Sequence, residues 1–374
     1  MANTSDTSNT TPRALRFSAA LNPQGGWLLA VRNYWPPILW SIVLLLIVAI
    51  VMGAGGTTLQ KTLIDALIKL MVVVGLYMFI GNSGILSFGH IGFMMIGAYA
   101  AAWQTCCPRT KKLFIPGLPD YLLTHQFPFL VSVIVSGLLA AVVALIAGSA
   151  LMRLSGIAAS IGTFAFLMIL NAVYLRWDPW TRGASTMTGL PVVTDAWIML
   201  AFIVVVMFGA FMYTRSRYGL SLKASRDDEV ASKAAGVNVY GQRLLSFVLS
   251  AFIVGMAGAL FGHFLGILTV DSFYLPLTFI TLSMLVVGGM QSLSGAVIGS
   301  IVISTLFEAL RQLEVGFEIG SSHIALPGGG REVGIGILML IILIFRRSGL
   351  TANQEIYWPF KGDTSAKTAM TRRS

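Results

Sequence analysis

Charge is the property this sequence most lacks. Only 11% of the 374 residues are Asp, Glu, Lys or Arg, whereas 56% are hydrophobic and the mean hydropathy is +0.81. A soluble globular domain carries about 25% charged residues, so this class is excluded. Cysteine is also scarce: Cys106 and Cys107 are adjacent, and neighbouring cysteines rarely reach disulfide geometry, which argues against a disulfide framework.

Catalytic and ligand-binding signatures are equally sparse. The chain has four histidines, and no nucleophile, base or metal-ligand grouping stands out, so we expect no catalytic residue and no metal site. The net charge of +10 comes from Lys and Arg scattered between apolar stretches, which excludes a nucleic-acid-binding face. There is no phosphate-binding Gly-rich loop with its Lys, so the chain is expected to hold no cofactor, and any ATP-driven step would require another polypeptide.

The hydrophobic residues gather in runs long enough to cross a membrane as helices. The predicted fold is therefore an all-α polytopic membrane protein with about ten transmembrane helices, some of them short or interrupted. The runs are 37–54, 59–80, 86–103, 128–151, 157–176, 196–213, 244–266, 276–290, 295–312 and 332–345. Membrane lipid is then a partner of most of the chain.

The polar segment 214–243 fixes the predicted topology. It carries six Lys and Arg residues, and such loops remain in the cytoplasm. Counting crossings from it places both termini in the cytoplasm. We therefore predict a disordered tail over 1–36, a transmembrane domain over 37–346 that includes the 214–243 loop, and a cytoplasmic tail over 347–374.

Two Gly- and Ser-rich turns precede helices in the two halves of the chain. The residues of interest are Ser87, Gly89 and His90 in the first, and Gly288, Gly289, Ser292 and Gly295 in the second. Unpaired backbone is not tolerated in lipid, so such turns are expected to lie against protein or a watery cavity. Their similar form predicts an internal, inverted repeat beside a translocation path. The alternative is that they are tight helix packing sites.

Few ionisable residues fall inside the predicted helices. Asp65 and Lys69 are four apart and are expected to pair, either beside the path or only to neutralise each other. Ser87 is a candidate N-cap, and His90 in the first helical turn is either near a bound carboxylate or packed against a carbonyl. His263 is expected to reach the membrane interface. Glu308 and Arg311 are predicted to form a surface pair.

The motifs together resemble those of one family, the LivM-type permeases of bacterial branched-chain amino acid ABC importers, within the wider superfamily of branched-chain amino acid, urea and ribose permeases. The resemblance spans about 35–350. It lies in GILSFGHIGF (84–93), RYGL (217–220), ASRDDEVASKAAG (224–236), FVLSAF (247–252) and FRRSGL (345–350). The second and third of these are the most specific.

The resemblance implies a transport subunit of the bacterial inner membrane rather than an enzyme. Its partners would be a LivH-like second permease, two cytoplasmic ATPases of the LivG and LivF type, and a periplasmic substrate-binding protein. The implied ATPase-coupling residues are Arg226, Asp227, Asp228, Glu229, Ala231 and Gly236. Urea, a small amide or an aromatic carboxylate is an alternative cargo, and a secondary transporter or channel is the alternative class.

Overall fold

The structure is a computed structural model that describes residues 34–315, 317–319, 322–324, 330–346 and 349–357. Most of the predicted N-terminal tail, 1–36, lies outside these residues. The same holds for 347–348 and 358–374 of the predicted C-terminal tail. The helical bundle lies within Pro36–Trp358.

Each of the ten predicted hydrophobic runs contains a helix, and the all-α fold is confirmed. The helices are α2 (Trp35–Ala54), α3 (Thr57–Leu76), α4 (His90–Thr105), α7 (Phe129–Leu151), α8 (Gly156–Arg176), α10 (Ala196–Arg215), α13 (Val239–Leu265), α14 (Leu275–Gly288), α15 (Leu293–Val315) and α16 (Gly330–Phe345). A π-helix, η1 (Tyr77–Gly81), extends α3. Among the described residues, eight helical stretches are long and apolar enough to span a membrane. The two predicted crossings outside these eight are α4 and α16, each of 16 residues, whereas α14 is counted together with the preceding residues from Val270.

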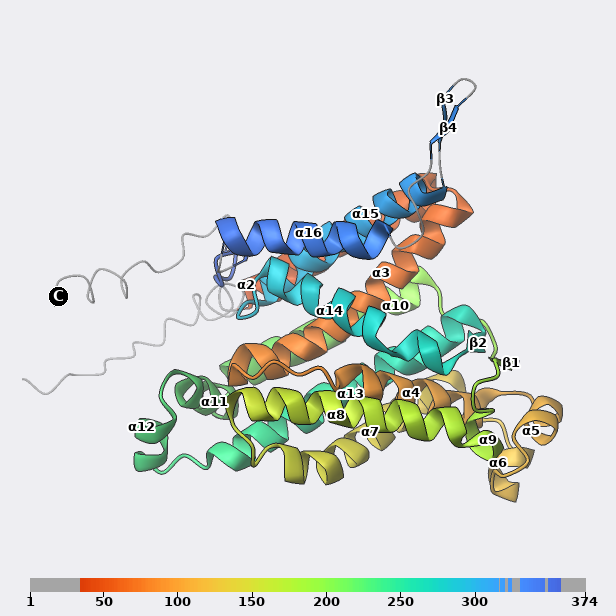
Figure 1. Cartoon of the computed structure of the whole chain (residues 1–374), viewed down its shortest axis with the longest axis horizontal. Helices are drawn as coiled ribbons and strands as arrows, with labels where there is room; N and C mark the ends of the chain where they lie inside the picture. Colours follow the sequence, from red (N-terminus) through yellow and green to blue (C-terminus); the bar gives the residue numbers. More distant parts are fainter. Residues whose placement is uncertain (1–33, 316, 320–321, 325–329, 347–348, 358–374) are drawn as a thin grey trace, which may run out of the picture. The chain divides into compact units, whose positions relative to one another are not determined.

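Short elements mark the two ends of the bundle (Figure 1). One end carries α11 (Arg217–Asp227) and α12 (Glu229–Ala234). The opposite end carries α5 (Pro108–Phe114), α6 (Asp120–Thr124), α9 (Asp178–Thr181), and an antiparallel pair of strands, β1 (Met187–Thr188) with β2 (Ile267–Leu268). Met187 pairs with Leu268 and Thr188 with Ile267. The 3₁₀ helix η2 (Val270–Phe273) follows β2, and the hairpin of β3 (Phe317–Ile319) and β4 (Ser322–Ile324) follows α15.

The core is built around α4, all sixteen residues of which are buried. It packs against α7 and α13. Glycines allow this approach, because a Cβ at Gly97 would overlap the backbone of Gly255, and a Cβ at Gly258 would overlap the carbonyl of Met94. In contrast, α2 and α8 are largely exposed and apolar, as expected for helices that contact lipid or another membrane protein.

Candidate functional site

The segment predicted to couple to an ATPase folds as two short helices, α11 and α12. Helix α11 ends at Asp227, and α12 begins after Asp228, whose Oδ1 accepts hydrogen bonds from Val230 N and Ala231 N, both at 2.9 Å. Asp228 therefore acts as an N-cap, which satisfies two helix-end N–H groups. Gly236 follows α12 with φ of +83°, the left-handed conformation with which glycine commonly ends a helix.

The charged side chains of this segment make their bonds within the chain. Glu229 accepts hydrogen bonds from Lys233 Nζ at 2.8 Å and from Arg243 Nη2 at 2.7 Å. The bonds from Lys233 and then Arg243 hold the pKa of Glu229 below its ordinary value. The bond between Glu229 and Arg243 therefore links α12 to the N-terminal part of α13. The exposed apolar groups are Val230, 79% accessible, and the small side chains of Ala231, Ala234 and Ala235; the side chains of Asp227 and Lys233 are exposed as well, at 71% and 62%.

Arg226 connects this segment to the first glycine turn. Its Nη2 lies 3.0 Å from Asp227 Oδ1, and its Nη1 donates to the carbonyl of Gly81 at 2.7 Å. Gly84 has φ of +72°, and a Cβ there would lie 2.6 Å from Arg226 Cγ. Glycine is thus required at 84 both for its backbone conformation and to make room for the arginine.

The first turn leads into an interrupted crossing. Residues 84–89 are not helical, and the Phe88 N–H donates to Thr163 Oγ1 at 3.3 Å. A Cβ at Gly89 would lie 2.7 Å from the carbonyl oxygen of Thr163. Because Thr163 is seven residues into α8, the start of α4 lies about 10 Å along that helix. Helix α8 therefore packs directly against the first turn.

The predictions for Ser87 and His90 need correction. Gly89, not Ser87, occupies the N-cap of α4, because the non-helical stretch continues two residues beyond Ser87. Ser87 Oγ instead lies 2.7 Å from His90 Nδ1. The His90 ring is buried against Phe79 and Phe247, with centroids at 5.5 and 5.3 Å, and its partner is a hydroxyl rather than a carbonyl. Its Nε2 has no partner among the described residues, so both predicted roles stay predictions.

The second turn, 289–292, is closed by the chain after α16. Gly289 has φ of +123°, a Cβ at Gly288 would overlap Gly295, and Ser292 Oγ accepts from Gly295 N at 3.0 Å. Thr351 donates to the Gly288 carbonyl through its N–H at 3.1 Å and its hydroxyl at 2.9 Å.

Glu355 completes this closure. Its carboxylate accepts from Leu293 N at 2.6 Å, Ser294 N at 3.1 Å and Ser294 Oγ at 2.8 Å, at the start of α15. Sequence reasoning missed Glu355, because 61 or 62 residues separate it from the groups that it binds and no local pattern marks a cap at that distance.

The two turn regions meet at one point. A Cβ at Gly81, just before the first turn, would lie 2.5 Å from the carbonyl oxygen of Met290 in the second. Gly89 itself faces α8 and Gly295 faces its own turn. The repeat and the translocation path stay predictions.

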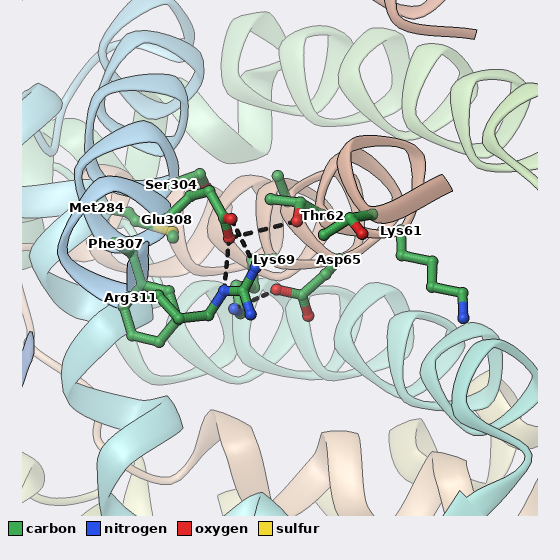
Figure 2. A pocket seen from close by; sticks show the side chains of 11 residues that line it. Lys61, Thr62, Asp65, Lys69, Met284, Ser304, Phe307, Glu308 and Arg311 are labelled. Atoms are coloured by element: carbon green, nitrogen blue, oxygen red, sulfur yellow. Dashed lines mark hydrogen bonds and ion pairs between the residues drawn. The ribbon is translucent and has the colours of Figure 1, made fainter. Parts of the chain in front are cut away.

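The Asp65–Lys69 pair forms as predicted, with Lys69 Nζ 2.5 Å from Asp65 Oδ2. It lines a cavity of about 300 Å³ between α3, α14 and α15 (Figure 2). Arg311 Nη2 lies 2.7 Å from Glu308 Oε1, and Lys69 Nζ lies 4.9 Å from the centre of the Phe307 ring. The predicted Glu308–Arg311 pair also forms, with the Arg311 side chain 38% exposed; both residues line this cavity, and Glu308 also accepts from Thr62.

The predicted position of His263 is also wrong. It is fully buried and does not reach the membrane interface. Its Nδ1 lies 2.7 Å from the Ala259 carbonyl and its Nε2 lies 3.0 Å from Thr105 Oγ1. The histidine therefore joins α13 to the end of α4. Sequence position near a helix end suggested exposure, but the neighbouring helix α4 covers it.

Comparison with known proteins agrees with this architecture. Residues 58–345 match the family described as "Branched-chain amino acid transport system / permease component". The chain is 25% identical over 348 residues to the high-affinity branched-chain amino acid transport system permease protein LivM of Escherichia coli, which covers 83% of this chain and 74% of LivM. It is 26% identical over 304 residues to the corresponding protein BraD of Pseudomonas aeruginosa, with 76% and 92% covered.

A shorter similarity extends to a second kind of permease. A LivH-type branched-chain amino acid transport permease of Methanocaldococcus jannaschii is 24% identical over 150 residues, or 40% of this chain and 45% of that protein. The family match covers most of the helical bundle, from the start of α3 to the end of α16. The chain therefore belongs to the family of permease components of branched-chain amino acid transport systems and is a LivM-type permease.

Proposed function

We propose that this chain is the membrane permease subunit of an ATP-driven importer in the bacterial inner membrane. It passes branched-chain or related hydrophobic amino acids from a periplasmic binding protein to the cytoplasm. A LivH-like permease completes the membrane part, and two LivG- and LivF-like ATPases hydrolyse ATP with Mg²⁺. The family membership and the names of the LivM and BraD relatives support this function.

The observation that carries the ATPase contact is the exposed face of α12. Val230 is 79% accessible and is flanked by the exposed alanines 231, 234 and 235. An apolar side chain of this size among small residues suits insertion into a groove on a partner protein. The bonds of Asp228 and Glu229 fix the position of α12. A displacement of α12 by the ATPase would therefore be transmitted to α13 through the Glu229–Arg243 bond.

The same segment reaches the membrane core by a second route. Arg226 sits between the exposed α11–α12 segment and the carbonyl of Gly81 at the end of η1. Movement of α11 by an ATPase would therefore act directly on the π-helix before the first glycine turn. This route needs no contact between the ATPase and the membrane helices themselves.

The test of the ATPase contact is Val230→Asp. A carboxylate buried in an apolar groove is strongly unfavourable, so copurification with the ATPases and substrate-stimulated ATP hydrolysis should fall at least about tenfold. Val192→Asp is the matched control, because Val192 is 68% accessible and lies by β1 at the opposite end of the bundle. Normal ATPase attachment in the Val230→Asp complex would refute the proposed contact.

Replacing Asp228 and Glu229 by lysine is a less selective test. It would remove the α12 cap and the Arg243 ion pair together with any contact to a partner. The cargo is tested separately, by ATP-dependent uptake of labelled leucine into proteoliposomes that hold the complete complex and its binding protein. Uptake of urea or benzoate in place of leucine, or leucine uptake that persists without the ATPases, would contradict the proposal.

A further inference from the structure

Several hydrogen-bonding groups that line the cavity with the two ion pairs have no partner among the residues that the structure describes. Asp65 Oδ2 is taken by Lys69, but Oδ1 has no partner within the described part of the chain. Arg311 uses Nε, at 2.9 Å, and Nη2 toward Glu308, which leaves three of its five N–H donors. Ser304 Oγ is buried and lacks a partner among the described residues. It is one of nine such atoms in the described part of the chain, and it is the one that lines this cavity, where it can donate to or accept from a bound ligand.

The charges of this cavity match a ligand that carries both signs. Asp65 is already paired with Lys69, and Glu308 with Arg311. A ligand with one charge would bring an uncompensated charge into a partly buried, paired site, which is unfavourable. A ligand with a cation and an anion can place its ammonium on Asp65 Oδ1 and its anion on the free face of Arg311. Lys61 at the rim extends away from this group (Figure 2).

An apolar cavity adjoins the charged one. It has a volume of about 110 Å³ and lies between α2, α3 and α15, where its apolar lining comes from Leu44, Ile47, Leu63, Leu67, Leu70 and Ile301. Ala66 and Ser304 line both cavities. The space is larger than the volume of about 30 Å³ that one water takes up in the liquid, and it suits a short aliphatic group.

We propose that the two cavities form one binding site for a free α-amino acid with an aliphatic side chain. The charged cavity takes the ammonium and carboxylate groups, and the apolar cavity takes the side chain past Ala66 and Ser304. This inference rests on the proposed function and deepens it, because it places substrate selection within the membrane chain as well as on the binding protein. A zwitterionic lipid headgroup shares the charge pattern, but its acyl chains far exceed the apolar cavity.

The first measurement is binding of tritiated leucine to the complete permease–ATPase complex in phosphatidylcholine nanodiscs, without the binding protein. We expect saturable binding that isoleucine and valine compete for. The single-charge analogues 4-methylpentanoate and 3-methylbutylamine should compete at least about tenfold more weakly, because each leaves one charged group of the site unmatched. Equal competition by either analogue would overturn the proposal.

Two variants test the two halves of the site. Asp65→Asn should weaken leucine binding at least about tenfold, through loss of the charged acceptor for the ammonium group. Because Lys69 then loses its partner, the second variant is Ser304→Leu, which adds volume where the cavities meet and changes no charge. It should weaken leucine binding about tenfold relative to glycine binding, since even one methylene in an apolar pocket changes selectivity by 10-fold or more. Ala309→Leu, at an exposed position of the same helix, is the control.

The outcomes separate this inference from the function on which it rests. If the complex imports leucine, but Ser304→Leu leaves both leucine binding and the leucine-to-glycine preference unchanged at normal abundance, the site is refuted and the importer stands. If leucine binds in phosphatidylcholine nanodiscs but not in phosphatidylethanolamine nanodiscs, the cavity holds a lipid. If the variants only detach the second permease, the cavity is a contact with that partner. If the complex imports no amino acid, the proposed function itself is wrong.

Discussion

Glu355 offers the sharpest test of how the chain after α16 supports the membrane helices. Its carboxylate accepts two backbone N–H groups and one hydroxyl at the start of α15. Removal of an N-cap acceptor costs about 1 kcal/mol, and loss of a negative charge at a helix N-terminus costs about 0.3 to 1 kcal/mol. Glu355→Ala should therefore lower the free energy of unfolding by about 2 kcal/mol, whereas Glu355→Gln, which keeps an acceptor, should lower it by about 1 kcal/mol or less.

The assay is thermal unfolding of the purified complex in detergent, followed by tryptophan fluorescence. The expected order of Tm is wild type, then Glu355→Gln, then Glu355→Ala, with a total span of a few degrees. Gln354→Ala is the matched control, because the Gln354 side chain is exposed and makes no hydrogen bond among the described contacts. Equal Tm values for Glu355→Ala and Gln354→Ala would show that the carboxylate does not hold α15.

Three further predictions follow from the same contacts. Gly89→Leu should abolish transport or assembly, because even a Cβ would approach the Thr163 carbonyl to 2.7 Å, whereas Gly53→Leu, with open space around it, should keep normal uptake and abundance. In intact cells, a membrane-impermeant maleimide should label the exposed native Cys107 but should not label an Ala234→Cys variant that lacks Cys107. Labelling of that variant from outside would show that the predicted topology is inverted. The bonds of Glu229 lower its pKa, so they add stability above its ordinary value of 4.5 that is lost as the pH falls through the folded pKa. Proteolytic protection of α12 should therefore be constant from pH 7 to 5 and decrease as the pH falls below 4.5, whereas protection in Glu229→Gln should not show this decrease.

The positions of the helices could be read from the sequence because hydrophobicity in a membrane chain is a strong local signal. All ten runs contain helices, although the apolar run that contains α4 begins at 86, four residues before the helix starts at His90. The difference has a physical cause: residues 86–89 are apolar or small, but they are not helical, and the Phe88 N–H bonds to Thr163 of α8. Hydropathy does not distinguish a buried non-helical stretch from a helical one.

The candidate site was harder to predict because its contacts span long distances along the chain. The pairs Asp65–Lys69 and Glu308–Arg311 were each visible from their helical spacing, but nothing in the sequence indicated that they line one cavity. The break at Asp228 was missed for a related reason. Asp and Ser are common N-cap residues, but Ser225, Asp227 and Asp228 all offer such a side chain, and the bonds to Val230 and Ala231 identify Asp228 as the cap.

The burial of α4 constrains how this protein is made. A helix whose sixteen residues all contact protein presents no face to lipid once folded, and it is too short to cross the hydrocarbon layer unaided. Its main neighbours, α7 and α13, are synthesised later, and α13 begins more than 130 residues after α4 ends. Until α13 emerges from the ribosome, α4 lacks the surface that covers its glycines. The final position of α4 is therefore reached late in biogenesis, and nascent chains truncated before α13 should leave it accessible to proteases or chaperones.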